Sequence, residues 1–420
     1  MKLLVFAHRL ELGGTQTNAI ELAAALRDRH GFEIVFHATP GPMDTVLKEK
    51  GLSLLPAPDA RYHPSYSRMR TLREIIRDEK PDLIHAWDWW QGLEAYLGAY
   101  LPLKVPLLIS DMMMTLTRVL PKGVPTTFGF RGLQEEASRK GWEKALLLPP
   151  PVDVEFNAPG LPFEETARAQ LGLEPHHVAL VTVSRLSHVM KSENIFQTIE
   201  AIRRIGRDVP IQFLIVGDGA ARPEIERQAQ AANTALGRKA ILLTGALADP
   251  RPAYAAADIV LGMGGSALRG MAFGKPVIVA GEKGFARPFC PQSVVTFETT
   301  GFYGIGRGDG ETYHLENMIR GLARDSLLRG AIGAFGQDYV TKNHALEKLS
   351  GDLADYCEEA ATAPPGLRVA DVTRSSFYYL RDRRFKTASR DRNDDPAGHG
   401  VSGETRSTAA PSAPETKEFS

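Results

Sequence analysis

Residues 259–280 read IVLGMGGSALRGMAFGKPVIVA, and this stretch decides the fold. A short apolar run, Ile259 to Met263, ends in a glycine-rich turn, and a helical pattern begins at Ser266. A second apolar run, Pro276 to Ala280, follows the helix. Strand, turn, helix and strand in this order predict a βαβ unit in a parallel sheet.

Two parts of the chain repeat this alternation. The first expected helix places Ala19, Leu22 and Leu26 at the spacing of an amphipathic helix packed on a sheet. The run Pro149 to Pro151 interrupts the pattern, because proline excludes both a helix interior and a central strand. The expected strands before the prolines span residues 3–7, 33–38, 82–86, 105–110 and 145–148, and those after them span 178–184, 211–216, 240–244, 259–263 and 276–280.

The proline break predicts an α/β protein of two doubly wound domains, residues 1–150 and 151–340. Residues 341–363 are expected to form a C-terminal helix that packs back toward the N-terminal domain. Residues 364–420 are expected to hold a basic and aromatic segment and a disordered tail. The tail, 387–420, has almost no large apolar side chains with which to offset chain entropy.

Composition and charge exclude several classes of protein. The 420 residues include 50 Lys and Arg against 50 Asp and Glu, so the net charge is zero and nothing favours nucleic-acid binding. The two cysteines, Cys290 and Cys357, belong to no ligand motif, so we expect reduced thiols and no metal site. We expect no signal peptide, and no apolar run approaches the ~20 residues that span a bilayer. These observations favour a cytoplasmic protein.

A basic and aromatic segment precedes the tail. Residues 374–390 interleave basic side chains with Phe377, Tyr378, Tyr379 and Phe385. Such a segment could make a peripheral contact with the anionic inner face of a membrane. It could equally be a last strand or helix that packs on the domain and exposes a basic face to water.

Two sets of residues have the character of a phosphate site. Gly13 and Gly14 follow the first expected strand and open the first helix, where unpaired backbone N–H groups attract anions. Arg185 follows the strand 178–184, and Lys191 stands at the start of the next helix. Ligands of open α/β sheets bind beyond the carboxyl ends of the strands, so both cations are expected beside a substrate.

Further motifs accompany these residues. They are the runs 216–219 (Val-Gly-Asp-Gly), 244–245 (Thr-Gly) and 254–260 (Tyr-Ala-Ala-Ala-Asp-Ile-Val), and the pair Arg222 and Glu224. In this order, and together with residues 262–279, the set resembles the donor domain of the retaining glycosyltransferase family four. The resemblance covers roughly residues 1–360. It implies the GT-B fold, in which two Rossmann-like domains face each other across a cleft.

The resemblance also implies roles for single residues. Arg185 and Lys191 match the positions that neutralise the diphosphate of a nucleotide sugar, and they are the expected catalytic residues. Ser266 is expected to cap the helix whose N-terminus faces the same phosphates. Because fixed cations and amides would stabilise the leaving group, no metal or cofactor is expected. The expected donor-binding residues are Gly13, Gly14, Gly217, Asp218, Gly219, Gly264, Gly265, Ser266 and Arg269.

The sequence departs from the family's donor-site signature at two positions. The family carries two glutamates eight positions apart, and the matching residues here are Leu261 and Arg269. A glutamate there accepts hydrogen bonds from ribose hydroxyls, whereas arginine only donates. We expect Arg269 to act as a third cation beside the phosphates, which would alter donor recognition.

The acceptor side departs as well. The family often has a histidine after the strand 105–110, where this chain has Ser110 and Asp111. His85 and Asp88 follow or end another strand. We expect His85, Asp88 and Asp111 to bind the acceptor by hydrogen bonds.

Together these features predict a glycosyltransferase. It would move a sugar, with retention, from a nucleotide-diphosphate donor to a glycan or lipid-linked acceptor in polysaccharide or glycolipid biosynthesis. The missing glutamates keep open a catalytically silent GT-B protein that serves as a binding or scaffold component. A nucleotide-sugar epimerase on the same fold is a further alternative.

Overall fold

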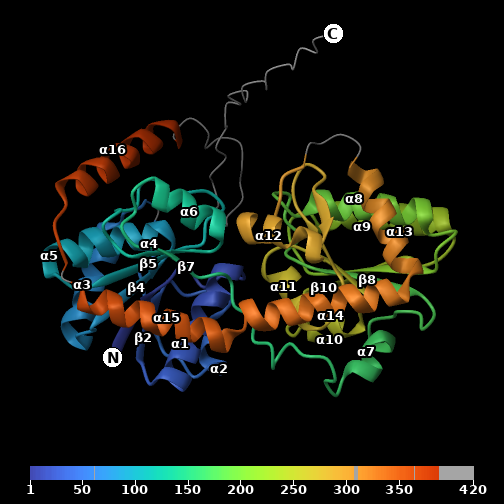
Figure 1. The fold of residues 1–420 in the computed structure, drawn as a ribbon, viewed down its shortest axis with the longest axis horizontal. Coiled ribbons are helices and arrows are strands. Elements are labelled where there is room, and N and C mark those ends of the chain that lie inside the picture. Colours follow the sequence, from blue (N-terminus) through green and yellow to red (C-terminus); the bar gives the residue numbers. More distant parts are fainter. Residues whose placement is uncertain (61, 307–310, 364, 387–420) are drawn as a thin grey trace, which may run out of the picture.

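The computed structural model describes residues 1–60, 62–306, 311–363 and 365–386. Within them the chain forms two α/β domains, each built on one sheet (Figure 1). The N-terminal sheet has seven parallel strands in the order β3-β2-β1-β4-β5-β6-β7. Its strands are β1 Lys2–Phe6, β2 Glu33–Ala38, β3 Leu54–Pro56, β4 Leu83–Trp87, β5 Leu107–Asp111, β6 Thr126–Phe128 and β7 Ala145–Leu147.

The C-terminal sheet has six strands in the order β10-β9-β8-β11-β12-β13, all parallel except that β13 runs antiparallel to β12. In each sheet the strand order reverses next to its first strand, between β1 and β4 in one domain and between β8 and β11 in the other. The strands are β8 Val178–Val183, β9 Ile211–Val216, β10 Ile241–Gly245, β11 Ile259–Gly262, β12 Val277–Ala280 and β13 Ala286–Pro288.

Helices cover the faces of both sheets (Figure 1). Those of the N-terminal domain are α1 Gly14–His30, α2 Asp44–Glu49, α3 Tyr66–Glu79, α4 Asp88–Ala95, the π-helix η1 Tyr96–Tyr100, α5 Leu101–Leu103 and α6 Arg131–Arg139. Those of the C-terminal domain are α7 Glu164–Gln170, α8 Ser192–Ile205, α9 Arg222–Leu236, α10 Arg251–Ala256, α11 Gly265–Ala272, the 3-10 helix η2 Pro291–Ser293, α12 Val294–Thr300, α13 Glu311–Arg324 and α14 Ser326–Asn343.

Local sequence explains where α1 begins and ends. Gly13 precedes it in extended conformation, and Gly31 follows it at a left-handed φ of 68°, donating its N–H to the carbonyl of Leu26. Glycine adopts that backbone conformation without the cost that a Cβ would add. Leu22 and Leu26 are fully buried against the sheet, as the apolar spacing predicts.

The chain crosses between the domains twice. After the proline run, the N–H of Val152 donates to the carbonyl of His344 at 2.7 Å, and the N–H of Leu346 donates to the carbonyl of Val152 at 2.8 Å. The second crossing leads into α15, Leu346–Thr362, whose Leu349 and Leu353 are buried with α1 in one core cluster. The two connections therefore lie side by side.

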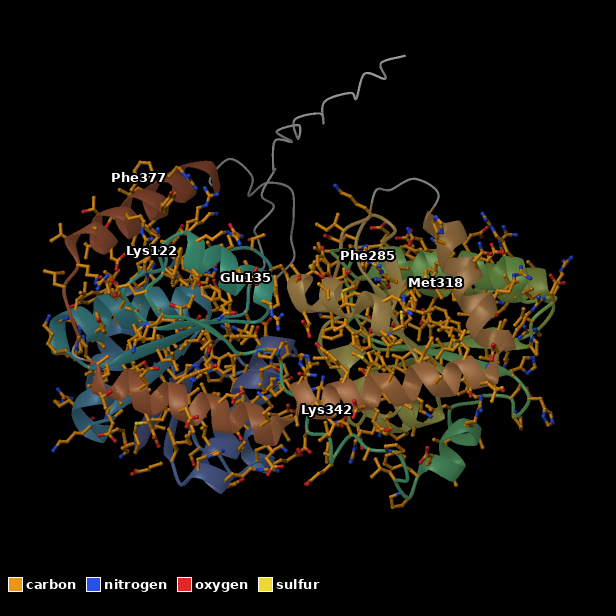
Figure 2. The ribbon with its side chains drawn as sticks, in the orientation of Figure 1. Lys122, Glu135, Phe285, Met318, Lys342 and Phe377 are labelled. Atoms are coloured by element: carbon orange, nitrogen blue, oxygen red, sulfur yellow. The ribbon has the colours of Figure 1, made fainter. Side chains whose placement is uncertain are left out.

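The last described helix, α16 (Val369–Lys386), packs on the N-terminal domain. The Asp371 carboxylate accepts the backbone N–H groups of Lys122 and Gly123 at 3.0 and 2.9 Å, and Arg374 donates to the carbonyl of Leu120. Figure 2 marks Lys122 and Phe377, which belong to the loop under α16 and to its exposed face. A packed helix is thus the alternative that the structure supports. The expected tail, 387–420, lies outside the described residues.

Candidate donor and acceptor site

A pocket opens where the strand order of the C-terminal sheet reverses. In doubly wound sheets this point, beyond the carboxyl ends of the strands, is where ligands bind. Neighbouring strands β8 and β11 lead the chain away to opposite sides, which leaves the space between their loops open. The pocket is lined by Thr182, Val183, Ser184, Lys191, Asn194, Gly262, Met263 and Ser266.

The pocket carries an excess of positive charge. Lys191 is half-buried at the N-terminus of α8, and Arg185 is exposed on the loop before it. Burial, with a smaller contribution from the positive charge of Arg185, lowers the pKa of Lys191 to about 8. Neither side chain forms a hydrogen bond or ion pair with any described residue. Two neighbouring cations without a protein anion, next to a helix N-terminus, suit an anionic ligand.

Ser266 lies on α11, just after β11, and its hydroxyl contacts the end of β8. It is not the cap of α11. Its hydroxyl donates to the carbonyl of Val183 at 2.8 Å and accepts the Tyr254 hydroxyl at 3.1 Å. The residue at the cap position of α11 is Gly264, with a left-handed φ of 52° and no side chain to accept a hydrogen bond. The predicted capping role of Ser266 is therefore wrong, because its hydroxyl is hydrogen-bonded to the Val183 carbonyl at the end of β8.

The glycines of the run 216–219 have a packing role. A Cβ on Gly217 would lie 1.9 Å from the Ser184 carbonyl oxygen, and one on Gly219 would lie 2.4 Å from that of Leu186. Both glycines also have positive φ, at 144° and 152°. They hold the loop that carries Arg185 close to the end of β9.

Asp218 stands between those two glycines and forms contacts of its own. Its carboxylate accepts hydrogen bonds from Arg222, at 2.8 Å, and from the backbone of Gly219. A contact of Gly217, Asp218 and Gly219 with a donor stays a prediction.

Other glycines leave space rather than fill it. A Cβ on Gly14 or on Gly264 would meet no atom within 4 Å, and one on Gly265 would meet only the guanidinium of Arg269, at 3.2 Å. A Cβ on Gly13 would meet the flexible side chain of Gln16. Packing therefore does not explain Gly14 and Gly264, and both leave room for a ligand to approach the backbone.

Arg269 reaches across to the N-terminal domain. Its Nη2 lies 3.6 Å from Oε1 of Glu21 on α1, with 24% and 17% of the two side chains exposed. Burial raises the pKa of Glu21, and its other oxygen, Oε2, is buried without a partner. The helices that follow the reversal-point strands β1 and β11 thus meet. Arg269 already has an anionic partner, and its role as a third cation beside phosphates stays a prediction.

All three predicted acceptor residues, His85, Asp88 and Asp111, are buried. His85 is 1% exposed, and its Nε2 bonds the Ser110 hydroxyl at 2.7 Å inside the sheet. Burial lowers the pKa of His85 to about 3, so it stays neutral. Asp111 is also fully buried, and burial together with the charge of Asp88 raises its pKa to about 7. Direct contact of His85 with an acceptor finds no support in this position.

Asp88 has a partner that the sequence reasoning missed. Its Oδ2 lies 2.7 Å from Nε2 of His8, a residue just beyond the end of β1. The available signal was position alone, because His8 directly follows the first strand, in the loop that ends at Gly13 and Gly14.

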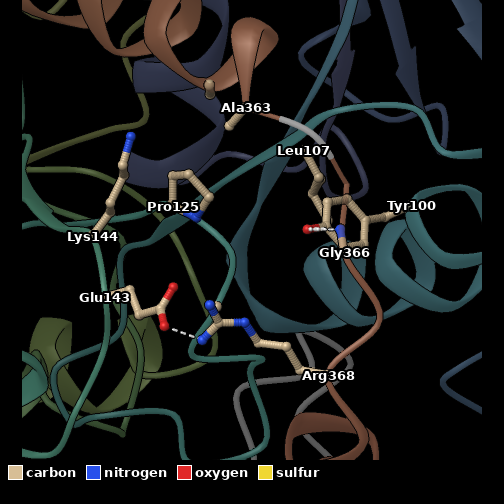
Figure 3. A pocket seen from close by; sticks show the side chains of 10 residues that line it. Tyr100, Leu107, Pro125, Glu143, Lys144, Ala363, Gly366 and Arg368 are labelled. Atoms are coloured by element: carbon tan, nitrogen blue, oxygen red, sulfur yellow. Dashed lines mark hydrogen bonds and ion pairs between the residues drawn. The ribbon is translucent and has the colours of Figure 1, made fainter.

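A larger cavity lies elsewhere and does not fit the same description. Figure 3 shows this space of about 280 Å³ at the amino ends of β5, β6 and β7. Its walls carry the Arg368–Glu143 ion pair and a hydrogen bond from the Gly366 N–H to the Tyr100 hydroxyl. Sheet ligands bind at the opposite edge, so this cavity is not the candidate site. Within the described residues, no three histidine, cysteine or carboxylate side chains gather as metal ligands would.

Two family models match the chain, one in each domain. Residues 177–330 match the family described as Glycosyl transferases group 1, and residues 12–111 match Glycosyltransferase Family 4. The chain has the GT-B fold, and each of its two domains matches a glycosyltransferase family model over part of its length. The predicted fold class, two facing Rossmann-like domains, is confirmed. The first match includes Arg185, Lys191 and Arg269, and the second includes Gly13, Gly14 and Asp88.

Solved structures show the same fold at low sequence identity. A glycosyltransferase from Rickettsia africae has a TM-score of 0.68 at 15% identity, over 86% of this chain and 98% of that one. Anabaena HepE in complex with UDP-glucose has a TM-score of 0.65 at 17% identity, over 86% of this chain and 100% of that one. UDP-GlcNAc 2-epimerase from Neisseria meningitidis has a TM-score of 0.59 at 12% identity, over 84% of this chain and 99% of that one. No curated protein matches the chain.

Proposed function

We propose that this GT-B protein transfers a sugar from a nucleotide-diphosphate donor to a glycan or lipid-linked acceptor, with retention of configuration and without a metal ion. The observation that carries the proposal is a pair of cations without an anionic partner among the described residues: Lys191, which lines the pocket between β8 and β11, and Arg185 on the adjoining loop. A diphosphate supplies the anion that these side chains lack. The expected setting is polysaccharide or glycolipid biosynthesis.

The chemistry follows from where charge develops. When the bond from the anomeric carbon to the diphosphate oxygen breaks, negative charge grows on the leaving group. Arg185 and Lys191 and the N-termini of α8 and α11 would stabilise that charge without having to reorganise. Because HepE was solved with UDP and with UDP-glucose, uridine donors are the first to test.

A donor screen tests the proposal. Binding of uridine, guanosine, adenosine and cytidine diphosphate sugars is measured by calorimetry on the full chain, and turnover is measured with the donor that binds. Arg185→Ala and Lys191→Ala are each expected to lower turnover about 100-fold. Lys239→Ala, which changes an exposed lysine in the loop between α9 and β10, is the matched control. Wild-type turnover in both pocket variants would refute the assignment.

The alternatives give different results in the same screen. A scaffold protein would bind none of the donors. An epimerase would convert the sugar of a donor in the absence of any acceptor, which chromatography of the nucleotide sugar detects. The likeness to the Neisseria enzyme, at a TM-score of 0.59, is the observation that keeps this second candidate under test.

We also propose a peripheral contact with the anionic inner face of the cytoplasmic membrane. No described helix is long and apolar enough to cross a membrane. The outer face of α16 exposes Val369, Phe377 and Leu380 at 71%, 60% and 62%. The sequence adds basic residues at 381–386, and apolar side chains flanked by cations suit an anionic lipid surface.

A further inference from the structure

Helix α16 turns its polar side chains toward the N-terminal domain and its apolar ones away from it. Its polar face holds Asp371 and Ser375, which are buried one turn apart, and the half-buried Arg374. Its apolar face holds Phe377 and Leu380, which are 60% and 62% exposed (Figure 2). A helix that packs on a domain normally does the reverse, because the burial of apolar surface stabilises the packing.

Several polar atoms buried at this contact have no hydrogen-bond partner within the described residues. They are the hydroxyls of Tyr96 and Ser375, Nε1 of Trp142, and Nε and Nη1 of Arg374, whose guanidinium lies over the Trp142 ring. Burial, and to a smaller extent the charge of Asp371, raise the pKa of Tyr96 to about 12, so its hydroxyl keeps its proton. Polar groups that are removed from water without a partner destabilise the docked state.

Hydrogen bonds to one short stretch of the domain hold α16 in place. The Asp371 carboxylate accepts the consecutive backbone N–H groups of Lys122 and Gly123 at 3.0 and 2.9 Å. Arg374 donates to the carbonyl of Leu120 at 2.6 Å. Water can replace such bonds at a small net cost, because each one adds little to stability beyond the hydration that it displaces. The attachment of α16 is therefore polar and local.

The loop that α16 holds also contacts the predicted acceptor residues. It spans residues 112–125 and connects β5 to β6. Directly after the buried Asp111, the N–H of Met112 donates to the Asp88 carboxylate at 2.7 Å. The far part of the loop, residues 120–123, is the part that α16 binds. One connection thus joins α16 to the buried carboxylates at the carboxyl ends of β4 and β5.

We propose that α16 is a strap that an anionic lipid surface releases from the N-terminal domain. This rests on the membrane contact given under the proposed function. Five basic and two acidic residues in α16 draw it to such a surface. There the apolar face, with Phe377 and Leu380, enters the headgroup boundary, and the polar face leaves the domain and is hydrated. Release removes the hydrogen bonds to residues 120–123 and loosens the loop that begins beside Asp88.

Hydrogen–deuterium exchange of the full chain tests release. The N–H groups of Lys122 and Gly123 are bonded to Asp371, so they should exchange slowly in solution. On phosphatidylglycerol vesicles their exchange is expected to accelerate about tenfold, and that of residues 112–117 about threefold. Phosphatidylcholine vesicles should change neither. Equal or slower exchange of Lys122 and Gly123 in vesicle-bound protein would overturn the inference, and acceleration confined to residues 120–123 would overturn the link to the acceptor side.

Two serine variants exclude a merely structural role. Ser375→Ala removes a buried hydroxyl that has no partner among the described residues, so it should favour docking and weaken phosphatidylglycerol binding about threefold. Tyr96→Phe should act in the same direction for the same reason. Ser376→Ala, the same change at the next, exposed position, is the matched control and should leave vesicle binding unchanged.

Unchanged or tighter vesicle binding in both Ser375→Ala and Tyr96→Phe would contradict release. If phosphatidylglycerol vesicles do not bind the wild type, the proposed membrane contact is refuted, and with it the partner assigned to α16. The donor screen judges the proposed sugar transfer separately, because it is carried out without lipid.

Discussion

The carboxylate of Glu21 on α1 and the guanidinium of Arg269 on α11 form an ion pair, 3.6 Å apart, between the two domains. The sequence resemblance predicts a glutamate at position 269, whereas this chain has a cation there and a carboxylate on the facing helix. Glu21 is buried enough to raise its pKa, and one of its oxygens has no partner. Arg269 thus takes part in a contact that joins the two domains.

Removing either member of this ion pair is expected to lower the free energy of unfolding, and removing Arg269 is expected to lower it more than removing Glu21. Arg269→Ala leaves a buried carboxylate without its cation and should lower the free energy of unfolding by roughly 3 kcal/mol. Glu21→Gln should cost less, because the freed guanidinium is the more exposed partner and can reach water. Urea unfolding of both single variants and of the double variant measures the coupling. Equal costs for the two single variants would contradict this account.

Arg269 is expected to change which donor binds rather than to prevent binding. An arginine favours phosphate oxygens or a base carbonyl over ribose hydroxyls, since it only donates hydrogen bonds. Wild type, Arg269→Ala and Arg269→Glu are compared by calorimetry across the four nucleotide-diphosphate sugars. Weaker binding of one donor in Arg269→Ala supports the prediction. If wild type binds none and Arg269→Glu binds one tightly, the site has degenerated.

Donor affinity is expected to fall above pH 8. The pKa of Lys191 is lowered to about 8, so the free side chain is an ammonium below that pH and a neutral amine above it. An anionic donor requires the ammonium, and binding should therefore weaken by up to about tenfold per pH unit between pH 8 and 10, with uptake of a proton. Calorimetry in buffers of different ionisation enthalpy measures that uptake. Lys191→Arg, which stays charged, should flatten the profile.

Two glycine variants separate a packing role from a ligand role. Gly217→Ala places a methyl group against the Ser184 carbonyl at a φ of 144°, and it should destabilise the protein by on the order of 3 kcal/mol. Gly14→Ala meets no atom within 4 Å, so the unfolding free energy should change by no more than about 0.5 kcal/mol while donor affinity falls. Unchanged donor affinity in Gly14→Ala would remove Gly14 from the site.

Helix α16 is expected to bind anionic vesicles in a salt-sensitive manner. Removal of the chain after Pro365 should abolish co-sedimentation with phosphatidylglycerol vesicles, and Phe377→Ser with Leu380→Ser should weaken it. Both side chains are exposed, so the double variant should fold normally. Neutral phosphatidylcholine vesicles are the control for the electrostatic part. Binding that survives the truncation would leave α16 as a packing element.

The sequence alone determined the class of fold. Short apolar runs, helical spacing and glycine turns are local features, and they predicted both doubly wound domains, the break at the prolines and the loops of Arg185 and Lys191. Local patterns failed for β3, β6 and β13, three of the four three-residue strands in the described sheets. Strands this short show no clear period and form by pairing with a neighbour; β7, the fourth, was predicted from its apolar run.

Only the tertiary structure decided which residues meet. His8 and Asp88 come together because β1 and β4 are neighbours, and Glu21 and Arg269 because the domains pack with α1 against α11. The strand order of the N-terminal sheet also places His85 in its buried interior. In the C-terminal domain, the hydroxyl of Ser266 donates to the Val183 carbonyl. Side-chain partners far apart in sequence are set by strand order and domain packing, which the local pattern of a single segment does not encode.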